Sequence, residues 1–257
     1  MKNNRNSSAI PAAVLALALF FAGTLSVTAQ PSDPAALKII RRIDAQQTAD
    51  TSASRISMHV YPNMHSGESR DYFIESFGKG EDISYMEFVA PRSIKGMKIH
   101  STDEEVRVYF PSTGRVRRIT GSGRSGSVGG VGGDFSYEDM GGGSLEENYT
   151  FSLLDESPGE WILEGIPTDS ESSYNRVVFF IDRELDLPVK IEYYTPEDGH
   201  QKTMTAENFT VVDGRNTSTL ITMTNHRELK KTVLKFHSIS FDVAVDEKLF
   251  NPQRFYR

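Results

Sequence analysis

Residues 174–194 read YNRVVFFIDRELDLPVKIEYY and contain the two segments that decide the class of fold. In residues 174–181 and 189–194, β-branched and aromatic side chains occupy odd and even positions alike. An amphipathic helix repeats its apolar residues every three or four positions, and a half-exposed strand alternates apolar with polar residues. The quoted segments therefore predict strands that are apolar on both faces, with an interior to fill on one side and a cover on the other.

Similar segments occur on both sides of this stretch, separated by turn signals such as Asp198-Gly199 and Asp213-Gly214. Roughly a dozen such segments can be counted along the chain. Besides the two quoted ones, they are residues 55–60, 72–76, 83–89, 97–101, 106–110, 149–154, 161–166, 202–212, 217–224 and 232–239. No helical pattern of about 10–15 residues separates them. We therefore predict a mainly β fold with a large antiparallel sheet or barrel.

One helix is expected before the sheet, over residues 33–49. Asp33 can cap its first turn, and Pro34 suits the first helical position. Apolar residues recur at helical spacing and are followed by a polar one in the same row: Ala36, Ile39, Ile40, Ile43 and Gln47. This stripe predicts an amphipathic helix that packs on the sheet.

The first 29 residues have the pattern of a secretory signal peptide. Lys2 and Arg5 precede an apolar run at residues 12–23, and residues 27–29 (VTA) suit a cleavage site. A membrane anchor is the alternative, but an anchor needs about 20 apolar residues. We expect cleavage after Ala29 and a single exported, soluble domain over residues 30–257. Since no Cys follows the run, we expect no lipid on the new N-terminus.

The composition excludes several classes of protein. The chain of 257 residues has no Cys and a net charge of −7. Without Cys there is no disulfide framework, no thiolate metal site and no thiol nucleophile. A nucleic-acid-binding protein needs a basic face, so the acidic balance argues against that class.

No motif supports catalysis. The pattern Gly121-x-Gly123-x-x-Gly126 is followed by glycine-rich coil where a dinucleotide site needs a helix. The six histidines lack metal-site spacing, and most of them are interpreted as ordinary polar-face residues. No G-x-S-x-G elbow occurs. The acidic pairs Glu138-Asp139 and Glu146-Glu147 suit glycoside chemistry but are more typical of solvated loops. We therefore expect no enzyme, no cofactor and no metal.

Two features remain as candidates for binding. Residues 121–143 are rich in Gly and Ser around one apolar-aromatic island, and they predict either a long surface loop or a lid over a cavity mouth. In the lid interpretation, Phe135, Tyr137 and Met140 form the plug. The second feature is a strand with three arginines at residues 115–119, which is either a solvated face or a basic rim for an anionic head group or an acidic partner.

The sequence also resembles a known family. Residues 87–99 (EFVAPRSIKGMKI) resemble the F-x-x-P-x-x-x-K-G stretch of outer-membrane lipoprotein-sorting-like proteins. Residues 133–140 (GDFSYEDM) resemble the GSDFSYEDL block of that family. Weaker similarity to the family occurs at residues 108–119, 193–202 and 241–252. Together the similarity extends over nearly all of residues 37–255.

This family is similar in fold to the periplasmic lipoprotein carriers of the Lol system, the LolA/LolB-like superfamily. The resemblance implies a mainly β fold with one large, curved, antiparallel sheet of about 11 strands. This sheet is an unclosed half-barrel whose concave apolar face holds acyl chains beneath a helix and a lid loop. It further implies a periplasmic carrier for lipoproteins or other acylated lipids.

The candidate acyl-chain contacts are Met58, Val60, Ile74, Phe88, Phe135, Tyr137 and Met140. The candidate rim for a head group or partner is Arg115, Arg117 and Arg118. We expect a monomer that binds acyl chains, meets membranes transiently, has an inner-membrane transporter as a partner and binds no nucleic acid. The alternative is a non-carrier accessory protein of an envelope lipid or efflux transporter.

Overall fold

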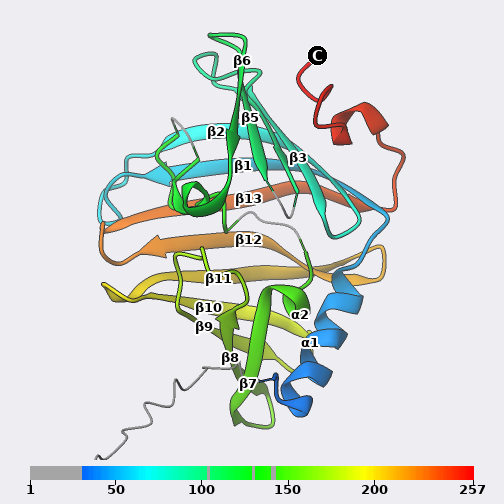
Figure 1. The fold of residues 1–257 in the computed structure, drawn as a ribbon, viewed down its shortest axis with the longest axis vertical. Coiled ribbons are helices and arrows are strands. Elements are labelled where there is room, and N and C mark those ends of the chain that lie inside the picture. Colours follow the sequence, from blue (N-terminus) through cyan, green and yellow to red (C-terminus); the bar gives the residue numbers. More distant parts are fainter. Residues whose placement is uncertain (1–30, 103–104, 129–130, 140–142) are drawn as a thin grey trace, which may run out of the picture.

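The computed structural model describes residues 31–257 except 103–104, 129–130 and 140–142 (Figure 1). The expected signal peptide and the candidate contact Met140 therefore lie outside the described residues. Among the helices of the described part, none is long and apolar enough to cross a bilayer.

Within the described residues, the strands form one 13-stranded antiparallel sheet. The strands are β1 Thr51–Tyr61, β2 Arg70–Lys79, β3 Ile83–Ala90, β4 Lys98–Ser101, β5 Val106–Phe110, β6 Arg115–Ile119, β7 Tyr149–Glu156, β8 Glu160–Pro167, β9 Arg176–Asp182, β10 Leu187–Thr195, β11 Gly199–Val212, β12 Arg215–Asn225 and β13 Lys230–Phe241. The predicted mainly β, unclosed antiparallel sheet is confirmed, with more strands than the expected 11 or so.

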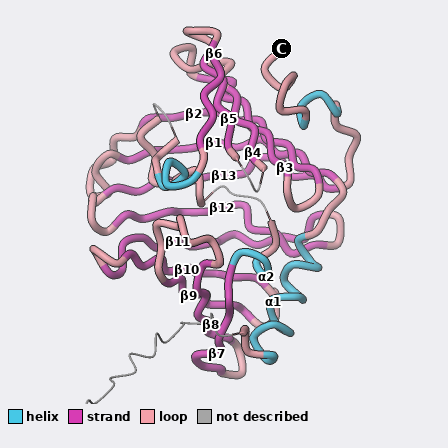
Figure 2. The backbone as a smooth tube through the Cα atoms, in the orientation of Figure 1, coloured by secondary structure: helices cyan, strands magenta, loops and turns pink. Residues whose placement is uncertain are grey.

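The strand order is β6-β5-β4-β3-β2-β1-β13-β12-β11-β10-β9-β8-β7 (Figure 2). The first and last strands of the chain are therefore neighbours near the middle of the sheet, and β6 and β7 are its two edges. Residues 120–148 connect these edges. This connection has to cross one whole face of the sheet, which we call the inner face.

Local sequence explains the hairpins. β11 and β12 are joined at Asp213 and Gly214, whose φ angles are 49° and 82°. Positive φ at both central residues is the geometry of the tight hairpin turn that favours Asp-Gly.

Helix α1, Pro34–Gln47, lies on the inner face against the half of the sheet that contains β7–β12 (Figure 1). Asp33 caps it, since its carboxylate accepts a hydrogen bond of 2.9 Å from the backbone N–H of Ala35. The buried row is the predicted one, Ala36, Ile39, Ile40 and Ile43, whereas Gln47 is exposed. The shorter helical elements are η1 Gly121–Ser125, α2 Leu145–Asn148 and η2 Glu247–Phe250.

The apolar residues of β9 are covered differently on the two faces of the sheet. Phe179 belongs to the inner core. On the outer face, the Lys190 ammonium lies 3.5 Å from the ring centroid of Phe180, and Arg176 forms an ion pair with Glu164. Long charged side chains cover apolar surface with their methylene groups and keep their charges in water. No second layer of strands is needed there.

The chain after β13 covers the outer face of β4 and β5. His100 is fully buried there, and its Nε2 is hydrogen-bonded to the carbonyl of Phe250 at 3.0 Å. Tyr109 stacks on Tyr256 with 5.6 Å between ring centroids. The interpretation of the histidines as ordinary polar-face residues is therefore wrong for His100. Burial lowers its pKa, which keeps the imidazole neutral.

Candidate functional site

An apolar cavity of about 290 Å³ lies on the inner face, between the central strands and the connection from β6 to β7. Its wall is made by side chains of β1, β2, β3, β4, β11, β12 and β13 together with residues of the connection. The lining residues are Ser54, Ile56, Met58, Ile74, Ser76, Met86, Phe88, Ile99, Val128, Val131, Gly133, Phe135, Asp139, Met204, Ile221, Leu234 and Phe236. Most of them are apolar, so the cavity suits an alkyl chain.

The structure brings four of the candidate contacts together in this wall: Met58, Ile74, Phe88 and Phe135. Val60 and Tyr137 are buried in the same apolar cluster but do not line the cavity. Met140 lies outside the described residues. That these side chains touch a lipid stays a prediction.

Several lining residues were not expected from the sequence. Ile56 pairs with Ile74 on one side and with Phe236 on the other, and Leu234 pairs with Met58. Since alternate residues of a strand share a face, Met58 alone implies Ile56, and the pairing then adds the residues of β13. The missing information was the register between β1 and β13, which no local pattern supplies.

The part of the connection that closes the cavity is residues 131–139, which we call the covering segment. Phe135 turns into the cavity, while Val131 and Tyr137 are buried against the inner face. The hydroxyl of Tyr72, on β2, donates a hydrogen bond of 3.3 Å to the carbonyl of Val131. The lid interpretation of this region is therefore consistent with its position, because apolar side chains hold it over the cavity.

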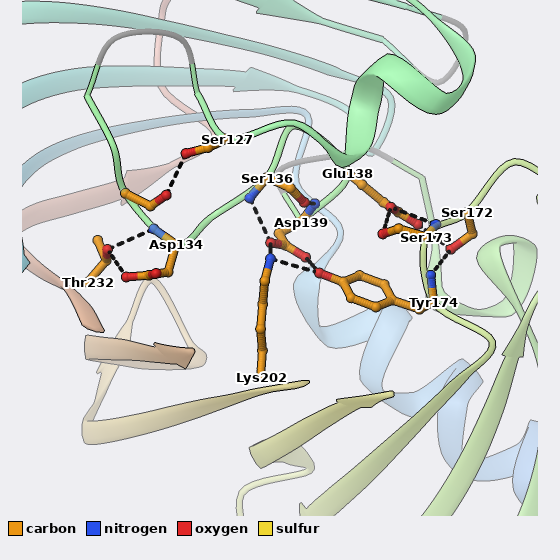
Figure 3. A network of polar contacts seen from close by, with 11 residues as sticks. Ser127, Asp134, Ser136, Glu138, Asp139, Ser172, Ser173, Tyr174, Lys202 and Thr232 are labelled. Carbon is orange, nitrogen blue, oxygen red and sulfur yellow. Dashed lines mark hydrogen bonds and ion pairs between the residues drawn. The ribbon is translucent and has the colours of Figure 1, made fainter. Parts of the chain in front are cut away.

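Polar side chains fasten the covering segment to the sheet (Figure 3). Asp134 exchanges two hydrogen bonds with Thr232 of β13. Glu138 accepts hydrogen bonds from the hydroxyls of Ser172 and Ser173 in the loop before β9. Each acid of the segment therefore meets a donor on another part of the inner face.

The third fastening is an ion pair. The Lys202 ammonium, on β11, donates to Asp139 at 3.1 Å and to the Tyr174 hydroxyl at 3.0 Å, and that hydroxyl donates to Asp139 at 2.7 Å (Figure 3). The side chain of Asp139 is only 1% exposed and that of Lys202 only 10%. The interpretation of Glu138-Asp139 as solvated acids is therefore wrong for Asp139. Burial and the Asp139 carboxylate raise the pKa of Tyr174, which stays a donor.

Two further cavities adjoin this triad. A polar one of about 470 Å³ is lined by Lys202 and Tyr174. Another of about 540 Å³ is lined by Asp139, Tyr174, Tyr193 and Met204. Asp139 and Met204 also line the apolar cavity, so these two cavities adjoin each other.

The three candidate arginines lie on β6, an edge of the sheet, away from the apolar cavity. All three side chains are exposed. Arg118 forms an ion pair with Glu105, whose side chain is 10% exposed and also binds Arg107. A charged edge strand resists pairing with other strands, which is a sufficient structural reason for these arginines.

The described residues contain no group of three or more His, Asp or Glu side chains placed to hold a metal ion. The site is therefore described by shape, apolar surface and one buried ion pair.

Comparison with known proteins agrees with this architecture. A candidate outer membrane lipoprotein-sorting protein domain from Vibrio parahaemolyticus superposes with a TM-score of 0.79 at 25% identity, covering 87% of this chain and 99% of that one. A DUF1329 family protein from Desulfovibrio piger gives 0.78 at 24% identity, with the same coverage. A LolA superfamily protein from Nitrosomonas europaea gives 0.71 at 20% identity, covering 85% of this chain and 98% of that one.

A search of curated proteins gave no match. A family model with the description "Uncharacterized protein" matches residues 80–257, which is more than half of the chain. The chain therefore belongs to the family of that model. Its fold is similar to those of the outer membrane lipoprotein-sorting protein domain and the LolA superfamily protein, as the resemblance of residues 87–99 and 133–140 predicts.

Proposed function

We infer that this protein is a non-enzymatic periplasmic carrier that binds lipoproteins or other acylated lipids through their acyl chains. The observation that carries the proposal is the apolar cavity of about 290 Å³ between the sheet and the covering segment. Ligand pockets begin at about 300 Å³, so the cavity already has the size of a small ligand site. Each methylene group buried in it would contribute about 0.8 kcal/mol.

The position of a second cavity beside the apolar one also supports a carrier. The adjoining cavity of about 540 Å³ shares Asp139 and Met204 with the apolar one. Displacement of the covering segment would therefore join two spaces into a larger one without disturbing any strand pairing. A longer or second acyl chain then has room. In this proposal the protein is a monomer that exchanges its cargo with a membrane or an inner-membrane transporter.

Mass spectrometry of an organic extract of the purified protein, residues 30–257, tests the proposal. We expect co-purified or re-bindable acyl lipid. Ile74→Phe fills the cavity and should remove most of the bound lipid. Ile166→Phe makes the same change at a side chain that is 44% exposed on β8, and it should leave the lipid in place. Absence of any bound or re-bindable lipid in the unchanged protein contradicts the proposal.

The exposed arginines of β6 favour one other function, that of an accessory protein that docks on an envelope transporter. Arg115 and Arg117 are the side chains that such a partner would meet. Cross-linking in intact cells distinguishes the two. A stable membrane-protein partner that depends on these arginines, together with an empty cavity, would favour the accessory role.

A further inference from the structure

The ion pair between Lys202 and Asp139 stands in the wall between the polar cavity and the apolar cavity. Lys202 lines the polar one of about 470 Å³, and Asp139 lines the apolar one. Gly133, in the covering segment, lines both. A ligand with its polar end in the polar cavity and its alkyl chain in the apolar cavity would therefore lie next to the Lys202–Asp139 pair.

The pair also sets a condition on displacement of the covering segment. If Asp139 moves away, the Lys202 ammonium is left in a site where only 10% of its side chain is exposed. An uncompensated buried charge costs several kcal/mol, whereas exchange of one anion for another avoids most of that cost. A neutral ligand cannot provide this exchange, but an anionic one can.

The other cations around the polar cavity do not offer the same exchange of one anion for another. Among the described lining residues, Arg227 pairs with Asp198 at 2.5 Å and Lys230 pairs with Glu228 at 2.5 Å. These partners lie on the sheet and its hairpin loops, not on the covering segment. Lys202 differs from these two cations, because its partner Asp139 belongs to the covering segment and would move away with it.

The geometry points to a binding site for an anionic single-chain amphiphile. Its alkyl chain occupies the apolar cavity, and its carboxylate or phosphate binds the Lys202 ammonium and the Tyr174 hydroxyl in the place of Asp139. This inference rests on the proposed carrier function and names the chemistry of its ligand. Asp139 acts as an internal substitute for the head group while no ligand is bound.

Titration calorimetry with three probes of one chain length tests the inference. Laurate carries a carboxylate, dodecyl phosphate carries a phosphate, and dodecanol is neutral. Each is used below its aggregation concentration. We expect the anionic probes to bind at least about tenfold more tightly than dodecanol, the ratio given by one charge-assisted hydrogen bond. The stronger of the two anions identifies the head group.

Three variants separate the head-group site from the cavity. Lys202→Met should reduce the preference for the anionic probes over dodecanol about tenfold or more. Lys202→Arg keeps the charge and should retain the preference. Asp139→Asn removes the competing carboxylate and should strengthen the anionic probes selectively. Lys190→Met, on the outer face of the neighbouring strand, is the matched control and should change none of them.

The outcomes are distinct. Equal affinity for all three probes, unaffected by either Lys202→Met or Asp139→Asn, overturns the head-group site and leaves the carrier function standing. No binding of any probe, together with no lipid in the extract, overturns the carrier function itself. If Lys202→Met does not fold, the selective gain in Asp139→Asn decides the matter, and its absence counts against the site.

Discussion

Thr232 on β13 and Asp134 in the covering segment satisfy each other completely. The Asp134 backbone N–H donates to the Thr232 hydroxyl oxygen, and that hydroxyl donates to the Asp134 carboxylate, both at 2.9 Å. Thr232 is fully buried and Asp134 is 5% exposed. These two buried hydrogen bonds therefore help to fix the position of the covering segment.

Thr232→Val removes both hydrogen bonds while keeping the side-chain shape. Each unsatisfied buried group costs about 1–3 kcal/mol, so we expect a loss of that order in the free energy of unfolding, measured with urea. Thr222→Val, on the outer face of β12, should cost much less. Equal effects of the two substitutions would show that the contact contributes little.

Asp134→Asn should change how stability depends on pH. Burial is the main cause that raises the pKa of the Asp134 carboxyl in the folded protein. Its contribution to stability is complete below the ordinary carboxyl pKa and is lost as the pH rises through the raised value. The amide has no such loss. We therefore expect Asp134→Asn to gain stability relative to the unchanged protein as the pH rises from below the ordinary carboxyl pKa of about 3.9. Unfolding midpoints measured on both sides of this pKa check it, and a pH-independent difference would contradict it.

Gly165→Ala should disturb the aromatic packing of the inner face. A Cβ at Gly165 would lie 2.9 Å from the Phe179 ring and 3.2 Å from the rings of Phe151 and Tyr149. Overpacking of this kind costs about 1–3 kcal/mol, which calorimetry would detect as a lower melting temperature. Gly159→Ala is the control, because nothing lies within 4 Å of its added Cβ. An unchanged melting temperature in Gly165→Ala would mean that the three rings can move apart at little cost.

The arginines of β6 should differ in their effect on stability. Arg118→Ala removes one of two cations from Glu105, whose side chain is 10% exposed, and we expect a cost of about 1 kcal/mol. Arg117→Ala changes an exposed side chain and should stay within about 0.5 kcal/mol. Urea unfolding of both variants checks the difference. Equal losses of stability in the two variants would contradict a specific contribution of the Arg118–Glu105 ion pair.

The sequence predicted the elements that local rules control. The cap at Asp33 and the apolar row of α1 gave the start and buried face of the helix, and residues 106–110 and 115–119 coincide with β5 and β6. Such features need only neighbouring residues, because caps, turns and alternation act over a few positions.

The arrangement of the site was not predictable in the same way. Asp139 and Lys202 are 63 positions apart, and the sequence around Asp139 alone is typical of a solvated loop. Its burial follows from the edge positions of β6 and β7, which send their connection across the inner face. The lining residues of β13 likewise required the register with β1.

The position of β1 beside β13 has a consequence for how the chain folds. Every other strand pair in the described sheet joins strands that are consecutive in sequence. β1 to β6 and β7 to β13 can each form by successive local hairpins, and only the β1–β13 seam requires closure of a loop that spans most of the chain. Formation of non-local pairings is slow. We therefore expect formation of this seam to be the slow step of folding. Substitutions within it should retard folding more than equally destabilising ones near β6 or β7.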